Sequence, residues 1–253
     1  MLLLLLLVAL PLLVHSAPVN TQFLPLDCED IYQNGSTHSG VYTIYPTESA
    51  AGQPLQVYCD MACTEDEGQG NQAWTVIQRR FDGSVNFYRS WEDYKNGFGT
   101  VSGEHWLGLD KIFLMTSLER YQLRVDMEDF DRGHAYAQYS SFHIDPESKS
   151  YALHVSDYIN GGAGDPLSSM DGRPFSTFDQ NPYGNCADGY MGGFWYSCWP
   201  SNGIANPNGL YKWQSISTST ADNSILWTTW KAIPLKTITM KIRRMTMNDI
   251  QQV

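Results

Sequence analysis

An apolar leader, followed by a small set of cysteines, constrains this chain more than any other feature. The first 17 residues, MLLLLLLVALPLLVHSA, contain no Asp, Glu, Lys or Arg. The apolar run is shorter than the ~20 residues that span a bilayer. The small residues Val14 and Ser16 stand at positions −3 and −1 of a cut after residue 16, so the run predicts a secretory signal peptide over residues 1–16. The alternative is an uncleaved anchor, which the interruption at Pro11 disfavours. We therefore expect a secreted chain, without membrane insertion, that folds under oxidising conditions.

Secretion decides how the cysteines are interpreted. The chain has five, and they lack the histidine partners of a zinc site, so disulfides are expected. Five cysteines form at most two intrachain bridges, and the remaining thiol either pairs with another chain or stays free. The one N-x-S/T sequon, Asn34-Gly35-Ser36, lies in a polar, turn-prone stretch and predicts glycosylation at Asn34. The cysteines are Cys28, Cys59, Cys63, Cys186 and Cys198.

Charge and motif content exclude several classes of function. The chain has 27 acidic and 16 basic residues, a formal net charge of -11, and no basic run that could neutralise phosphates. It is therefore not expected to bind nucleic acid or to adhere to anionic lipid. The motifs H-E-x-x-H and G-x-S-x-G and a phosphate-binding glycine loop do not occur, and the histidines are scattered. We expect no enzymatic activity.

Short alternating runs separated by turns predict an antiparallel sheet. Strands are expected at 41–45, 74–80, 121–127 and 237–243, and the apolar residues of 121–127 should face the core. Ser90 and Gly97 bound a short predicted helix, and 117–120 predicts one further turn. Residues 160–225 are rich in Gly, Pro, Asn and Ser. They predict an ordered loop subdomain, pinned by a disulfide and by aromatic side chains, which is a usual place for a binding site.

These runs belong to an ordered series of motifs that covers residues 26–245. In this series the chain resembles the fibrinogen C-terminal (fibrinogen-related) domain. A short tail, 17–25, precedes the domain, and residues 246–253 form a C-terminal tail. The motifs are SGVYTIYP at 39–46, VYCDM at 57–61, WTVIQRRFDGS at 74–84, FYRSW at 87–91, YKNGFG at 94–99, GEHWLG at 103–108, YQLRVD at 121–126, GAGD at 162–165, FSTFD at 175–179, NCA at 185–187 and KIR at 241–243.

The resemblance implies an α+β fold with three parts. These are a small N-terminal disulfide subdomain, a central twisted antiparallel sheet with short helices, and a loop-rich C-terminal binding subdomain. It also implies the disulfides Cys28–Cys59 and Cys186–Cys198, which leave Cys63 unpaired. Because an exposed thiol is unstable in a secreted protein, we interpret Cys63 as an interchain link and expect a homo-oligomer. A free thiol is the alternative.

The resemblance further implies a calcium-binding loop after residue 178. Calcium requires six to eight oxygen ligands, mostly carboxylates and carbonyls. In FDQNPYGNC, at 178–186, Asp179 is the only acidic residue and Asn181 stands where a second Asp is expected. With one carboxylate, strong Ca²⁺ binding is hard to support. The alternative is a turn in which Asp179 accepts hydrogen bonds from local backbone N–H groups.

A ligand pocket beside the second disulfide, often occupied by an acetyl group, is the other implied site. Several of its positions are changed in this chain: Trp199 stands where His is typical, Thr220 replaces a Tyr, and 202–207 reads as an insertion. The Ser197–Cys198 peptide bond matches one that is often cis in the family. Four other tryptophans (Trp195, Trp213, Trp227 and Trp230) are expected to be core residues. The candidate ligand-binding residues are Tyr190, Ser197, Cys198, Trp199, Thr220 and Ala221.

Two functions are consistent with this resemblance. The first is a secreted, non-catalytic recognition protein that binds glycans or acetylated ligands on microbes or host glycoproteins. The second is a structural extracellular-matrix protein of elastic fibres that binds other matrix proteins. A glycan array and a solid-phase assay with matrix proteins separate the two.

Overall fold

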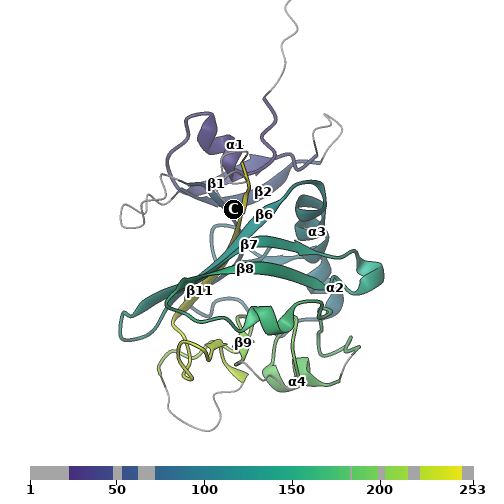
Figure 1. Cartoon of the computed structure of the whole chain (residues 1–253), viewed down its shortest axis with the longest axis vertical. Coiled ribbons are helices and arrows are strands. Elements are labelled where there is room, and N and C mark those ends of the chain that lie inside the picture. Colours follow the sequence, from purple (N-terminus) through teal and green to yellow (C-terminus); the bar gives the residue numbers. More distant parts are fainter. Residues whose placement is uncertain are drawn as a thin grey trace, which may run out of the picture.

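An antiparallel sheet forms the centre of the molecule (Figure 1). The computed structural model describes residues 23–47, 53–61, 72–182, 184–198, 203–215 and 223–246. The main strands follow the order β1-β2-β3-β11-β6-β7-β8, and the short strands β4 and β5 attach to β3 through β5. The strands are β1 (Gly40–Ile44), β2 (Leu55–Asp60), β3 (Trp74–Arg80), β4 (Phe98–Gly99), β5 (His105–Trp106), β6 (Tyr121–Glu128), β7 (His134–Ile144), β8 (Leu153–Gly161) and β11 (Thr237–Arg244).

Short helices and one small second sheet complete the described fold. Ser90 caps α2 by accepting the Asp93 N–H, as the sequence predicts. None of the described helices is long and apolar enough to cross a membrane. The helices are α1 (Cys28–Gln33), α2 (Trp91–Asn96), α3 (Leu109–Leu118) and α4 (Cys186–Tyr190), the 3₁₀ turns are η2 (Glu147–Lys149) and η3 (Leu167–Met170), and the second sheet pairs β9 (Ala205–Asn206) with β10 (Leu226–Trp227).

The central strand β6 shows why the sheet is stable. Its alternating apolar side chains are at most 3% exposed, which confirms the predicted core face. The opposite face is polar but also shielded: Gln138 donates to Gln122 at 3.0 Å, and the Arg124 guanidinium lies 3.7 Å from the centre of the Tyr136 ring. Both faces are therefore covered. The apolar residues are Tyr121, Leu123, Val125 and Met127.

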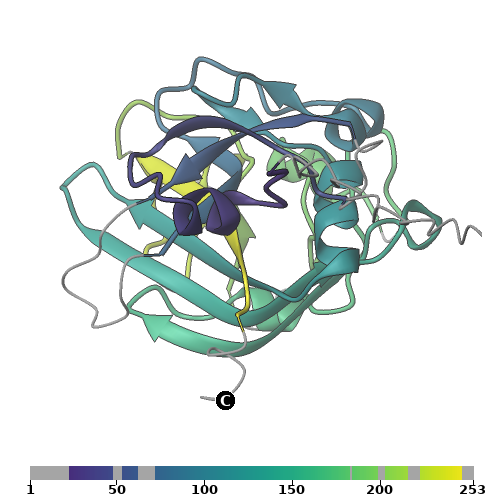
Figure 2. The same cartoon turned by 90° about the horizontal axis from the view of Figure 1, so that it is seen from above.

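The N-terminal subdomain is attached to the sheet by one disulfide and one buried carboxylate. Cys28 and Cys59 are bonded, with Cα atoms 5.4 Å apart, as the resemblance implied. The buried Asp27 caps α1 and accepts the Tyr121 hydroxyl at 2.8 Å. Burial raises the pKa of Asp27, and Arg244 on β11 opposes that shift. Figure 2 shows α1 beside β11, where Arg244 forms an ion pair with Asp30.

The expected C-terminal loop subdomain follows β8. It contains η3, α4 and the β9–β10 pair, joined by segments without regular structure, and it lies at the lower end of the sheet in Figure 1. Two sequence expectations need correction. The turn at 117–120 is the end of the ten-residue helix α3, and strand β7 and the edge strand β8 were not predicted. Neither burial pattern alternates strictly, and the pairing of β7 with β6 shifts register at Ser140 and Ser141.

Candidate functional site: the C-terminal loop subdomain

Buried side chains of β3 hold the loop subdomain in place. Gln78 Nε2 donates to the Pro207 carbonyl at 3.0 Å and to Asn208 Oδ1 at 3.1 Å. Arg80 Nη1 donates to the Gly209 carbonyl at 2.8 Å. The Gln78, Arg80 and Asn208 side chains are at most 1% exposed. Because a buried polar group is costly unless it is hydrogen-bonded, these contacts fix the position of residues 207–209 on the sheet.

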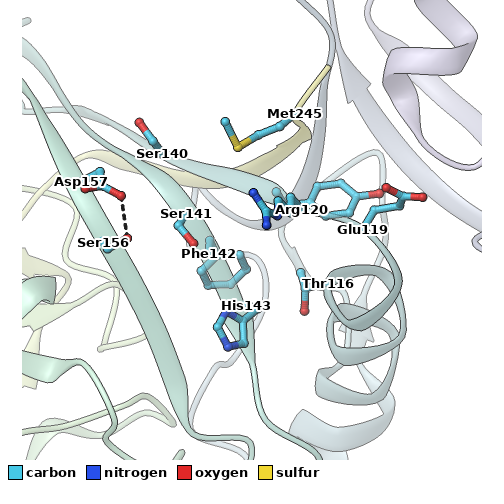
Figure 3. A pocket seen from close by; sticks show the side chains of 11 residues that line it. Thr116, Glu119, Arg120, Ser140, Ser141, Phe142, His143, Ser156, Asp157 and Met245 are labelled. Carbon is cyan, nitrogen blue, oxygen red and sulfur yellow. Dashed lines mark hydrogen bonds between the residues drawn. The ribbon is translucent and has the colours of Figure 1, made fainter. Parts of the chain in front are cut away.

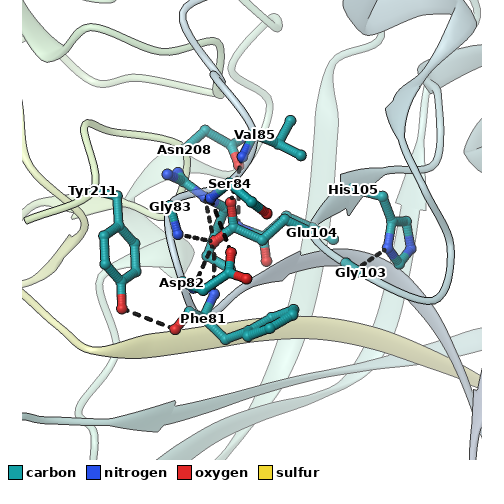
Figure 4. Close-up of polar contacts among 12 residues, drawn as sticks. Phe81, Asp82, Gly83, Ser84, Val85, Gly103, Glu104, His105, Asn208 and Tyr211 are labelled. Atoms are coloured by element: carbon teal, nitrogen blue, oxygen red, sulfur yellow. Dashed lines mark hydrogen bonds and ion pairs between the residues drawn. The ribbon is translucent and has the colours of Figure 1, made fainter. Parts of the chain in front are cut away.

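The carboxylate of Glu104 organises the turn that follows β3 (Figure 4). Glu104 is fully buried and lies 3.7 Å from Arg80 Nε. Burial lowers the pKa of the Arg80 guanidinium, and the Glu104 charge opposes this shift. A carboxylate that accepts several backbone N–H groups fixes the conformation of the turn that carries them. Its oxygens accept the backbone N–H groups of Phe81 at 2.7 Å, Asp82 at 3.1 Å, Gly83 at 2.9 Å and Val85 at 3.1 Å.

This turn supports an exposed tryptophan. Trp213 is 72% exposed, which corrects its predicted core position. Its Nε1 donates to the Asp82 carbonyl at 3.2 Å, and its ring meets Tyr211 edge-on at 5.6 Å. A Cβ on Gly83 would lie 2.8 Å from the Tyr211 ring, so glycine is required beneath this pair. Trp213 is thus an oriented aromatic surface. By contrast, Trp195 and Trp227 are fully buried, as predicted, and Trp230 packs partly buried against the core.

The structure brings three of the predicted ligand residues together around the second disulfide. Cys186 opens α4 and is bonded to Cys198, which confirms the implied pairing. Tyr190 closes the same helix, and its ring lies 4.7 Å from that of Tyr196. Ser197 precedes Cys198 and is 7% exposed. The described residues contain no cis peptide bond, so the expected cis bond at Ser197–Cys198 is wrong. The other candidates, Trp199, Thr220 and Ala221, lie outside the described residues.

Asn206 connects this cluster to the rest of the subdomain. It is fully buried, and its Nδ2 donates to the Tyr190 carbonyl and to the Ser224 carbonyl, both at 2.9 Å. The Tyr196 hydroxyl donates to Asn206 Oδ1 at 2.7 Å. The segment that reads as an insertion, 202–207, therefore ends in the buried centre of the subdomain. Sequence reasoning missed Asn206 and Asn208 because asparagine in a polar stretch is typical of an exposed loop.

Asp179 forms part of a hydrogen-bonded turn. Its Oδ1 accepts the Trp91 backbone N–H at 2.9 Å and the Thr177 hydroxyl at 2.7 Å. Asn181 Nδ2 donates to the Phe178 carbonyl at 3.1 Å, while its Oδ1 is buried without a hydrogen-bond partner. Within the described ranges, no three His, Cys, Asp or Glu side chains gather in a metal-binding group. Among the described side chains, this loop offers one hydrogen-bonded carboxylate and one amide oxygen, whereas calcium takes six to eight oxygen ligands.

The remaining predicted site residues fall in the N-terminal part. Asn34 is exposed at the end of α1, where a glycan can be attached without displacing any packed side chain. Cys63 lies outside the described residues. Cysteine linkage between chains therefore remains a prediction.

Comparisons with known proteins agree with the resemblance. The family model described as fibrinogen beta and gamma chains, C-terminal globular domain, matches residues 24–248. Bovine microfibril-associated glycoprotein 4 is 46% identical over 232 residues, which are 87% of this chain and 86% of that protein. Its human counterpart is 46% identical over 231 residues, 87% and 85% of the two chains. Within the family, the short tail and the sequence LDCEDIY at 26–32 also favour this relative.

Solved structures show the same fold. The fibrinogen-like globe domain of human ANGPTL2 superposes with a TM-score of 0.78 at 36% identity, covering 87% of this chain and 99% of that one. Lamprey fibrin D-dimer, solved in complex with the peptide Gly-His-Arg-Pro-amide, gives a TM-score of 0.76 at 32% identity, covering 88% and 76%.

Proposed function

Because this protein belongs to the family of the C-terminal globular domain of fibrinogen beta and gamma chains, we propose that it is a secreted, non-catalytic recognition protein. In this proposal the C-terminal loop subdomain binds glycans or acetylated ligands on microbes or host glycoproteins. The observation that carries it is the ordering of that subdomain. A disulfide, Asn206, Asn208 and the Glu104 carboxylate fix loops that have almost no regular structure. Loops fixed before binding lose little conformational entropy when a ligand arrives.

The expected anchor of the ligand is an aromatic side chain rather than a metal ion. Asp179 is engaged in hydrogen bonds with Trp91 and Thr177, so a cation is not needed to order its loop. Tyr190 ends the helix that begins at Cys186 of the disulfide, and Trp199 follows Cys198 directly in the sequence. We propose that the sugar stacks on Trp199 and Tyr190, and that binding depends only weakly on calcium.

We expect Trp199→Ala to weaken binding to immobilised N-acetylglucosamine about 30-fold, the equivalent of ~2 kcal/mol for an anchoring aromatic side chain. Removal of calcium with a chelator is expected to leave most of the binding intact. Surface plasmon resonance with and without chelator measures both. Trp213→Ala is the matched control, because it removes a second tryptophan at a different place in the subdomain. If chelation or Asp179→Ala abolishes binding while the fold persists, the calcium-independent site is rejected.

A structural role in the extracellular matrix is the second candidate function. It is favoured by the 46% identity to a protein named for its association with microfibrils. The two proposals differ in the ligand, so a glycan array and a solid-phase assay with elastic-fibre and collagen proteins distinguish them. If Trp199→Ala leaves glycan binding unchanged, the recognition surface lies elsewhere and the matrix role gains support.

Oligomerisation is expected to depend on Cys63. The secreted protein should migrate as a disulfide-linked dimer on a non-reducing gel, and Cys63→Ser should convert it to a monomer. Near- and far-ultraviolet circular dichroism of the variant should remain unchanged, because Cys28–Cys59 and Cys186–Cys198 are separate bridges. A wild-type monomer with one titratable thiol contradicts the interchain link.

A further inference from the structure

A pocket outside the loop subdomain lies on the strands β6 to β8, beside the end of α3 (Figure 3). Its volume is about 560 Å³, within the roughly 300–1,000 Å³ of small-molecule sites. Its lining combines apolar side chains, Phe142 and Met245, with hydroxyl and charged groups. The polar residues of the lining include Glu119, Arg120, Ser140, Ser141, His143 and Asp157.

Two irregularities of the sheet meet at this pocket. Between the pairs Tyr121–Phe142 and Leu123–Tyr139, one residue of β6 faces two residues of β7, Ser140 and Ser141. This is a β-bulge. On the opposite side of β7, Asp157 has a φ of 56°, an unfavourable value for a residue with a side chain. Bulges and left-handed residues redirect side chains and are concentrated at binding sites.

The polar groups of the pocket are available for a ligand. The exposed Arg120 guanidinium has no hydrogen bond or ion pair within the part of the chain that the structure describes. The same is true of the Ser140 and Ser141 hydroxyls. Asp157 uses one carboxylate oxygen to accept the Ser156 hydroxyl at 2.8 Å. The pocket thus offers both donors and acceptors.

The side wall that His143 contributes to the pocket is held in a fixed position. The His143 ring stacks on the His154 ring, with centroids 4.4 Å apart and planes within 12°. His154 Nε2 in turn lies 3.1 Å from Asp145 Oδ2. A ligand therefore meets an imidazole that is already oriented.

We propose that this pocket binds a saccharide unit with a single carboxylate, a hexuronate. Arg120 pairs with the carboxylate in the bidentate geometry that guanidinium favours. The serine hydroxyls and Asp157 bind the sugar hydroxyl groups, which both donate and accept. Two acidic side chains, Glu119 and Asp157, and a net charge of -11 disfavour a densely sulfated polymer.

Glucuronate and glucose form a matched pair of probes, since they differ only in the carboxylate. In nuclear magnetic resonance titrations of the mature protein, glucuronate should shift the amide signals of residues 140–143 and 156–157 at lower concentration than glucose does. Arg120→Ala should weaken glucuronate binding about tenfold or more, because a charge-assisted hydrogen-bond pair is lost. Glucose binding should not change.

Arg132→Ala is the control, because it removes the same charge from an exposed position at the other end of β7. The proposal is overturned if glucuronate does not bind, if glucose binds equally well, if the shifted signals lie elsewhere, or if the two arginine variants behave alike. Binding of N-acetylglucosamine by the loop subdomain is a separate measurement. Arg120→Ala should leave it unchanged, so failure at one site is not confused with failure at the other.

Discussion

Glu104→Gln is expected to lower the free energy of unfolding by about 3–5 kcal/mol, the usual cost of breaking a buried ion pair from one side. The substitution keeps the size of the side chain. It leaves the buried Arg80 charge without its counter-ion and points an NH₂ group toward backbone N–H groups that need an acceptor. Urea unfolding followed by circular dichroism measures the change.

Glu119→Gln is the control for this substitution. Glu119 is exposed, and the same chemical change there should stay within about 0.5 kcal/mol of the wild type. The turn at 81–85 also holds Tyr211 and Trp213 through backbone carbonyls. Glu104→Gln should therefore alter the fluorescence of the exposed Trp213 below the unfolding transition. A loss of stability no larger than that of Glu119→Gln contradicts the role assigned to Glu104.

Gly97→Ala is expected to destabilise the fold by more than about 3 kcal/mol, among the larger effects of a single substitution. Gly97 ends α2 with φ 93° and ψ 156°, a conformation that is essentially restricted to glycine. An added Cβ would also clash with backbone atoms, lying 2.8 Å from Leu107 C and 2.9 Å from Trp106 O. Strand β5 would have to move.

Gly35→Ala separates the two causes. Gly35 has nearly the same φ, 96°, but nothing lies within 4 Å of an added Cβ. Gly35→Ala should lower the free energy of unfolding by about 1–2 kcal/mol, the cost of the unfavourable backbone conformation alone. The substitution preserves the glycosylation sequon. Thermal unfolding of both variants gives the comparison. Equal losses in the two variants would show that crowding against β5 is unimportant.

Local sequence patterns predicted the elements that have a clear alternation of apolar residues or a capping residue at each end. The strand 121–127 alternates cleanly because β6 lies between two neighbours and buries one apolar face. Helix α2 has both a Ser cap and a terminating Gly. Most of α3 was missed because its N-cap, Gly108, makes no side-chain hydrogen bond and gives no start signal. Strand β7 was missed because the bulge at Ser140 and Ser141 interrupts its alternation.

The arrangement of the loop subdomain depends on contacts that no local pattern reveals. Asn208 is buried because Gln78, 130 residues earlier in the sequence, supplies a hydrogen bond. Trp195 and Trp213 are chemically identical, yet one is fully buried and the other 72% exposed. The difference comes from neighbours. Phe175 and Trp106 pack against Trp195, whereas the contacts of Trp213 within the described residues are with the turn at 82 and with Tyr211. Family resemblance supplied the disulfide pairs, which spacing alone left open.

The position of β11 determines when the molecule can fold. This strand, Thr237–Arg244, is among the last described residues, yet it lies between β3 and β6 and is the only link between the two halves of the sheet in the described strand order. Until the ribosome has released this segment, β1-β2-β3 and β6-β7-β8 remain separate sheets, each with one exposed edge where β11 belongs. The two halves of the sheet therefore cannot be joined until β11 has been synthesised and has left the ribosome. A premature stop codon between residues 162 and 236 keeps both halves but removes β11, and so leaves both open to pairing with the wrong partner.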